Sequence, residues 1–94
     1  MVEGFEWDPG KAEANLRKHG VSFTAATRVF EDILRVEWED VREEYGEERY
    51  ISVGMVNAEL LSVAYMVRDD VIRIISARRT SKEEKAHYHG NRPI

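Results

Sequence analysis

The pattern of apolar and polar positions predicts four β-strands in the second half of the chain. In residues 34–41, LRVEWEDV, apolar and polar side chains alternate from Leu34 to Glu39, which is typical of an antiparallel strand with one wet face. Residues 49–56, 60–67 and 71–77 are richer in β-branched side chains, and the last of these, VIRIISA, is expected to be buried on both faces. Short polar connections at residues 57–59 and 68–70 suit hairpins rather than crossover helices. We therefore expect an antiparallel meander.

The first half of the chain predicts a short strand and two helices. In FEWDPGKAEANLRKHG, Asp8 is placed to cap a helix that has Pro9 at its first position and ends at Gly20. The apolar stripe of this helix is narrow, so the helix is expected to cover a sheet; the stripe consists of Ala12, Leu16 and His19. Ser22 is predicted to cap a second helix, whose inward positions follow three-and-four spacing at Phe23, Ala26, Thr27 and Phe30.

A short C-terminal helix completes the predicted fold. Thr80 and Ser81 each precede a glutamate by three residues, Glu83 and Glu84, which is the spacing of a capping box. Residues 1–94 are thus expected to form one α+β domain, with the N-terminal helices on one face of a four-stranded antiparallel sheet. The second face of that sheet, or its rim, is left for function.

Length and composition narrow the classes of function. A chain of 94 residues has room for one modest core, so any site is expected to be a shallow groove. There are no cysteines, which excludes disulfides, thiolate catalysis and cysteine-based zinc sites. No apolar run approaches the ~20 residues of a membrane span, and the N-terminus has no signal-peptide pattern. We expect a soluble cytoplasmic protein.

The charge is distributed unevenly along the chain. The net charge of −4 argues at first against nucleic acid. Residues 31–48, however, carry nine acidic and two basic side chains, whereas residues 68–94 carry seven basic and four acidic ones. A molecule polarised in this way can offer one surface to an anion and another to a cationic partner, although both runs are equally consistent with solvated faces.

Arginines are the main chemical candidates. Arg78 and Arg79 directly follow the last predicted strand, and Arg49 begins a neighbouring one. Their planar, permanently charged groups match phosphate oxygens. The structural alternative is that the pair at the strand end forms ion pairs with Glu83 and Glu84 or with the acidic stretch.

The histidines do not show the spacing of a metal site. His87 and His89 are two residues apart and would point to different sides of a helix, while His19 has no fixed partner in the sequence. A phosphate-cradling glycine loop and a nucleophile elbow are also missing from the sequence. We expect neither a metal nor another cofactor.

Four stretches of the sequence together resemble a known family. FEWDPGKAEANLRKHGVSF, YGEERYISVG, RDDVIRIISARR and EEKAHY, between Phe5 and Tyr88, resemble the BrnT family of bacterial toxins, small ribonucleases with a fold similar to RelE. The resemblance implies an endoribonuclease that cuts RNA and arrests translation. It also implies neutralisation by a BrnA-type antitoxin with a ribbon-helix-helix part, through which operator DNA is contacted indirectly. Thr24, Ala25, Met66 and Val67 depart from the expected pattern, but no basic or aromatic candidate is lost.

This resemblance suggests catalytic roles for the candidates. Without a metal, the ribose 2′-hydroxyl attacks the adjacent phosphorus, and preorganised cations neutralise the charge that develops. Arg78 is the first candidate for this role, with Arg49 or Arg79 assisting. His19 is a candidate for proton transfer, with a helix C-cap as its structural alternative. Expected RNA contacts are Lys18, Tyr50, Tyr88 and Lys82.

Two further expectations concern alternatives and partners. The same arginines would serve a non-catalytic module that binds an acidic partner or RNA backbone, and such a binder would tolerate lysine at Arg78. As an exposed strand-end residue, Arg78 is expected to contribute only about 0.5 kcal/mol to stability. An antitoxin is expected to place acidic or aromatic residues over the arginines, and basic residues near the acidic region that comprises Glu37, Glu39, Glu43, Glu44, Glu47 and Glu48.

Overall fold

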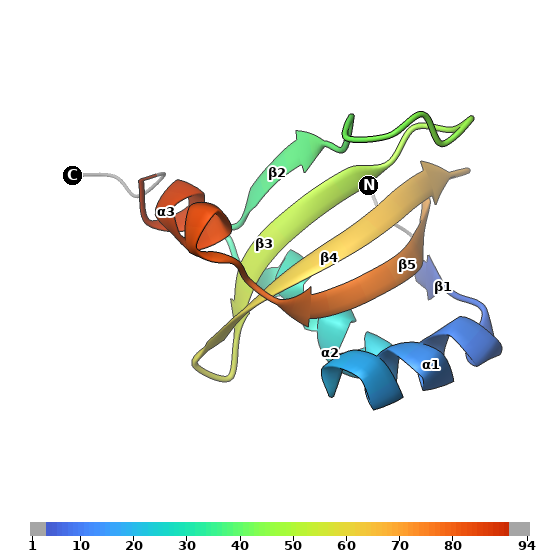
Figure 1. The fold of residues 1–94 in the computed structure, drawn as a ribbon, viewed down its shortest axis with the longest axis horizontal. Helices are drawn as coiled ribbons and strands as arrows, with labels where there is room; N and C mark the ends of the chain where they lie inside the picture. The colour runs from blue at the N-terminus through green and yellow to red at the C-terminus, as the bar shows by residue number, and fades with distance from the viewer. Residues whose placement is uncertain (1–3, 91–94) are drawn as a thin grey trace.

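The computed structural model describes residues 4–90, which form one sheet with helices on both of its faces (Figure 1). The N-terminal half contains β1 (Gly4–Glu6), α1 (Pro9–His19), α2 (Phe23–Thr27), the short 3-10 helix η1 (Arg28–Glu31) and β2 (Val36–Glu39). The C-terminal half contains β3 (Tyr50–Val56), β4 (Glu59–Arg68), β5 (Val71–Arg79) and α3 (Lys82–Gly90). The predicted helices and strands are all present among the described residues.

The sheet differs from the prediction in one strand. Within residues 4–90 it has five strands in the order β1-β5-β4-β3-β2. Strands β2 to β5 form the expected antiparallel meander, but β1 pairs in parallel with β5, from Gly4 opposite Val71 to Glu6 opposite Arg73. The α+β class is therefore confirmed, and the four-stranded, fully antiparallel sheet of the RelE-like expectation is wrong. The extra pairing joins segments at opposite ends of the chain, which no local pattern specifies.

Tight turns connect the meander as predicted. Asn57 and Ala58 join β3 to β4, and Asp69 and Asp70 join β4 to β5, all four with φ between 48° and 67°. Two consecutive left-handed residues make the hairpin turn whose twist matches that of the strands. The turns fix the register, so that Arg79 lies opposite Leu61 at the end of the sheet nearest the first turn.

The predicted helix starts are confirmed in atomic detail. Asp8 Oδ1 accepts a hydrogen bond from Gly10 N at 2.8 Å, and Ser22 Oγ accepts one from Ala25 N at 3.0 Å. Gly20 ends α1 in the left-handed conformation, with φ of 70°. Each of these positions was defined by side-chain chemistry within a few residues of the helix end.

The predicted apolar stripe of α1 is partly wrong. Leu16 is 50% exposed, whereas Asn15 is buried. Asn15 Nδ2 donates to Ala77 O at 2.8 Å, and Ala77 N donates to Asn15 Oδ1 at 3.1 Å. Because β1 ends opposite Arg73, β5 has no strand partner on that edge at Ala77, and the amide of Asn15 takes the place of one.

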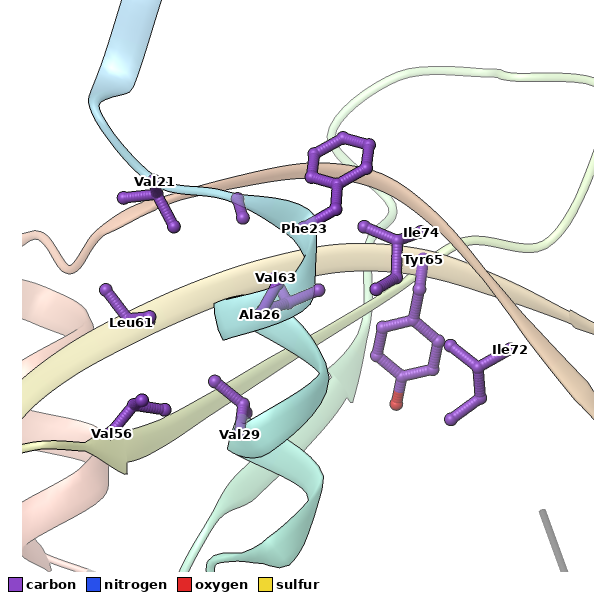
Figure 2. Packing of buried hydrophobic residues seen from close by; sticks show 11 residues of the cluster. Val21, Phe23, Ala26, Val29, Val56, Leu61, Val63, Tyr65, Ile72 and Ile74 are labelled. Carbon is purple, nitrogen blue, oxygen red and sulfur yellow. The ribbon is translucent and has the colours of Figure 1, made fainter. Parts of the chain in front are cut away.

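The main core lies between α2 and the inner face of the sheet (Figure 2). Val29 packs so closely on β3 that a Cβ atom at Gly54 would lie 2.9 Å from the Val29 carbonyl oxygen. Glycine is therefore required there to let η1 approach the strand. The buried members of this core are Val21, Phe23, Ala26, Val29, Val56, Leu61, Val63, Tyr65, Ile72, Ile74 and Ala77.

A second cluster lies on the other face of the sheet, where α3 covers it. Tyr88 is 2% exposed and packs with Ile51, Val53 and Leu60. Its hydroxyl donates to Asp32 Oδ2 at 2.6 Å, which ties α3 to the turn before β2. The second face had been expected to be open for function. It is instead partly covered, because α3 folds back over it.

Candidate active site

Arg78 is held by a carboxylate of α3. Its two terminal nitrogens donate to the two oxygens of Glu84, each at 2.8 Å. Glu84 Oε1 also accepts from Ser81 N at 2.9 Å, and Glu84 N donates to Ser81 Oγ at 3.2 Å, which completes the predicted capping box. The structural alternative for Arg78 is thus what the fold shows, with Glu84 rather than Glu83 as the partner.

The environment of Glu84 makes this pair part of the fold. The carboxylate side chain is 9% exposed and also accepts from Ser62 Oγ at 3.2 Å. Burial alone raises the pKa of Glu84, but the hydrogen bonds from Arg78 and the Ser81 backbone outweigh it, so the pKa lies below its ordinary value. Glu84 is consequently a buried anion that depends on Arg78 for its counter-charge.

Arg79 projects into a more exposed setting. Its Nε donates to Glu59 Oε2 at 2.9 Å, and one terminal nitrogen donates to the carbonyl oxygen of His19 at 3.2 Å. The side chains of Arg79 and Glu59 are 62% and 55% exposed. The last carbonyl of α1 therefore positions the guanidinium, while its carboxylate partner remains in water.

Arg79 also lines a concavity between α3 and the β3–β4 hairpin. This hollow, here called the Arg79 concavity, has a volume of about 340 Å³. Lys85 and His89 reach it from α3, and Glu59 and Thr80 border it from the strand ends. Among the described residues Thr80 Oγ1 is buried without a hydrogen-bond partner. Lys85 and His89 thus face the opening from α3, while Arg79 and Glu59 border it at the end of the sheet and pair their charged groups beside the end of α1.

The other end of the sheet holds Arg49 and Tyr50. Arg49 lies over the Tyr45 ring, 4.1 Å from its centroid, and donates to Glu47 Oε1 at 3.3 Å. Tyr50 donates to Glu48 Oε2 at 2.7 Å. Arg78 in β5 lies opposite Ser62 in β4, which in turn lies opposite Val53 in β3. Arg49 precedes Val53 along the chain, which places it roughly 13 Å further along the strand direction. The structure does not bring Arg49 or Tyr50 to either strand-end arginine.

The remaining candidates divide by exposure. Lys18 and Lys82 are exposed, at the end of α1 and the start of α3. His19 closes α1, and its carbonyl holds Arg79. Tyr88 is buried in the second cluster, where its hydroxyl contacts Asp32 rather than the surface.

Comparison with known proteins places the chain in a family. Residues 7–84 match the family described as the ribonuclease toxin, BrnT, of type II toxin-antitoxin systems. The chain belongs to the BrnT family. Membership indicates a ribonuclease toxin with RNA as substrate and an antitoxin as partner. No curated protein matches the sequence.

The described part of this BrnT family member lacks two kinds of structural feature. Within residues 4–90, no three side chains of His, Cys, Asp or Glu are grouped so that they could hold a metal ion. No helix in that range is both long and apolar enough to cross a membrane.

The sequence interpretation named Lys82 as an RNA contact but missed Lys85, His89 and Glu59, which line the Arg79 concavity. Lys82, Lys85 and His89 are spaced three and four residues apart, which places them along one side of α3 and was a detectable signal. Glu59 carried no comparable signal, because its approach to Arg79 depends on the register of the β4–β5 hairpin. The match to the BrnT family ends at residue 84, so Lys85 and His89 lie beyond it.

Proposed function

We propose that this BrnT family member is a metal-independent endoribonuclease whose site is the Arg79 concavity. The 2′-hydroxyl of the substrate attacks the adjacent phosphorus, and the resulting cleavage of RNA halts translation in the cytoplasm. The observation that carries the proposal is the gathering of basic residues at one end of the sheet, with Arg79 beside α1 and Lys85 and His89 on α3, in a protein of a ribonuclease family. This reaction needs cations that stabilise the charge developing on the phosphate and groups that transfer protons, and these side chains can provide both.

Arg79, rather than Arg78, is assigned to the phosphate. The guanidinium of Arg78 is committed at both terminal nitrogens to Glu84, and releasing it would leave a buried carboxylate without its counter-charge. The pair of Arg79 with Glu59 is exposed, and such pairs contribute only ~0–1 kcal/mol. A substrate phosphate therefore displaces Glu59 from Arg79 at little cost, whereas Arg78 serves to hold α3 beside the site.

The neighbouring basic residues extend the site along α3 and α1. Lys85 adds a cation on the α3 side of the concavity, and Lys82 lies one turn earlier on the same side of the helix. Lys18 is exposed at the end of α1 whose last carbonyl holds Arg79. We propose that Lys82 and Lys18 contact the RNA backbone on either side of the cut. Arg49 and Tyr50 lie too far along the sheet to take part, and Tyr88 acts by anchoring α3.

The partner is proposed to be a BrnA-type antitoxin whose ribbon-helix-helix part binds operator DNA, so that this chain contacts DNA only through it. The loop between β2 and β3 carries much of the predicted acidic region, and its two ends are joined by a hydrogen bond from Asp40 N to Arg49 O at 2.7 Å. An acidic surface of this kind favours a basic segment of the antitoxin.

The site proposal is tested by cleavage assays on purified variants. Arg79→Ala and Arg79→Lys are compared with Arg68→Ala, which removes an exposed arginine at the opposite end of β4. We expect both Arg79 variants to lose at least 100-fold in cleavage rate with unchanged melting, because a lysine cannot replace a two-pronged phosphate contact. Full activity of Arg79→Lys would indicate simple charge attraction, and an inactive wild-type protein that still binds RNA would indicate a non-catalytic binding module.

A further inference from the structure

Strand β2 forms one edge of the sheet, where no other strand of the described chain pairs with its outer side (Figure 1). Asp40 N donates to Arg49 O at 2.7 Å, so the backbone of Asp40 faces β3, and that of Trp38 does the same because an antiparallel ladder alternates. The N–H and C=O groups of Glu37 and Glu39 therefore point away from the sheet. Free backbone groups in a row of this kind accept a further strand.

The face of β2 that α3 covers is apolar. Val36 and Trp38 project from it and line a hollow of about 930 Å³. Ala86 and His87 close the hollow from α3, with 5.5 Å between the ring centroids of Trp38 and His87. Because β2 is the edge strand, this hollow lies beside the free backbone groups. Apolar side chains of an added strand would pack there.

The other face of β2 is acidic. Glu37 is already engaged, since Arg35 Nε donates to its Oε1 at 2.6 Å and the Tyr65 hydroxyl donates to its Oε2 at 2.9 Å. Glu39 is exposed, and its carboxylate forms no hydrogen bond or ion pair with another residue that the structure describes. Glu39 is therefore available to a basic side chain directly opposite it on a neighbouring strand.

A second copy of this chain does not fit the free edge. Residues that lie opposite each other in an antiparallel pair project to the same face. In both copies the free backbone groups belong to Glu37 and Glu39, so pairing β2 with another β2 would set glutamate against glutamate, which is destabilising. The occupant that fits alternates basic with apolar side chains, with the basic residues opposite the glutamates and the apolar ones towards Trp38.

We propose that an alternating basic and apolar segment of the antitoxin adds to β2 as an antiparallel strand, an inference that rests on the partner in the proposed function. The residues opposite Glu37 and Glu39 exchange backbone hydrogen bonds with them, and the apolar side chains between enter the hollow beside Trp38. The added strand lies four strand spacings from β5, roughly 19 Å from the strand that carries Arg79. Docking at β2 is therefore separable from RNA cleavage.

Amide hydrogen exchange, followed by NMR on the free protein and on its complex with the antitoxin, tests the added strand directly. In the free protein the amides of Glu37 and Glu39 should exchange fast and that of Trp38 slowly, because only Trp38 is bonded within the sheet. Complex formation should slow both glutamate amides by at least about tenfold. A complex in which these two amides remain fast would overturn the proposal.

A synthetic peptide of alternating lysine and valine is a defined probe of the same chemistry. Its control is a peptide of equal composition with the lysines and valines in separate blocks. The alternating peptide should slow exchange at Glu37 and Glu39, and the block peptide should not. Equal effects of the two peptides would show that the alternating pattern is irrelevant and would contradict the proposed occupant.

Two substitutions at Glu39 separate the backbone from the charge. Glu39→Gln removes the charge and keeps the N–H, whereas Glu39→Pro also removes the outward N–H without breaking a bond between β2 and β3, because an edge strand tolerates proline there. We expect Glu39→Gln to weaken antitoxin binding, and Glu39→Pro to weaken it about tenfold more, as for the loss of one backbone hydrogen bond. Equal affinity of the two variants would exclude strand addition.

Glu43→Gln is the matched control, because Glu43 is an exposed glutamate of the loop that follows β2. It should slow association only, whereas Glu39→Gln should also raise the dissociation rate. All three variants should cleave RNA at the wild-type rate, since none lies at the Arg79 concavity. A wild-type protein that binds the antitoxin through β2 but cleaves no RNA would overturn the proposed function and leave the docking site standing.

Discussion

Arg78 and Arg79 are consecutive in β5, yet their guanidinium groups are held by opposite sides of the molecule. Arg78 binds Glu84 in α3, and Arg79 binds the last carbonyl of α1 together with Glu59. The alternation of side chains along a strand causes this division. Arg78 therefore helps to attach α3 to the sheet, whereas Arg79 is exposed at the surface.

The first prediction concerns stability. Arg78→Ala should lower the free energy of unfolding by about 2–3 kcal/mol, because it leaves the buried Glu84 carboxylate without a charged partner. This replaces the value of about 0.5 kcal/mol expected for an exposed arginine. Urea unfolding of the two proteins measures the difference.

A second substitution identifies the cause of that loss. Arg78→Ala combined with Glu84→Gln should be more stable than Arg78→Ala alone, because the stranded charge is gone. Equal stability of the single and double variants would mean that the pair is not what holds α3.

The second prediction concerns metals. Cleavage should continue in excess EDTA and should leave a 2′,3′-cyclic phosphate, since an attacking 2′-hydroxyl closes that ring whereas a metal-activated water does not. End-group analysis of the RNA fragments reads out the product. Loss of activity in EDTA that Mg²⁺ restores would point to hydrolysis instead.

The third prediction concerns pH and the acidic loop. The hydrogen bond from the Arg42 side chain lowers the pKa of Asp40 to about 2, against the opposing effect of burial. Because the folded pKa is depressed, the stability that ionised Asp40 contributes is fully present above the unfolded pKa of roughly 3.9 and is lost as the pH falls towards 2. Asp40→Asn should therefore melt lower than the wild type at pH 7, and the gap should narrow between pH 4 and pH 2. A gap that is constant with pH would exclude this linkage.

The fourth prediction concerns the antitoxin. Association of the purified pair should slow as ionic strength rises, because charge complementarity acts mainly on the association rate and is screened over ~8 Å at physiological salt. Changing Glu43, Glu44, Glu47 and Glu48 to glutamine should slow it further. Insensitivity to both changes would mean that the acidic loop is a solvated face and no more.

Local signals predicted most of the elements and part of the site. Helix caps at Asp8, Ser22 and Ser81 were visible because capping depends on side chains within a few residues. The pairing of β1 with β5 and the burial of Asn15 were not visible, because they depend on segments more than 60 residues apart. The site divides in the same way, since the basic row on α3 follows from helical spacing whereas the neighbours of Arg78 and Arg79 follow from register and docking.

The link between Asn15 and Ala77 has a consequence for synthesis on the ribosome. Both β1 and the amide of Asn15 emerge early, but their partners lie in β5, near the end of the chain. The β1 segment of the nascent protein must therefore wait until β5 has been made, and the fold closes in a single late event. A chain interrupted before β5 lacks the strand that joins its two ends, so incomplete translation should leave unfolded fragments and no partly working enzyme.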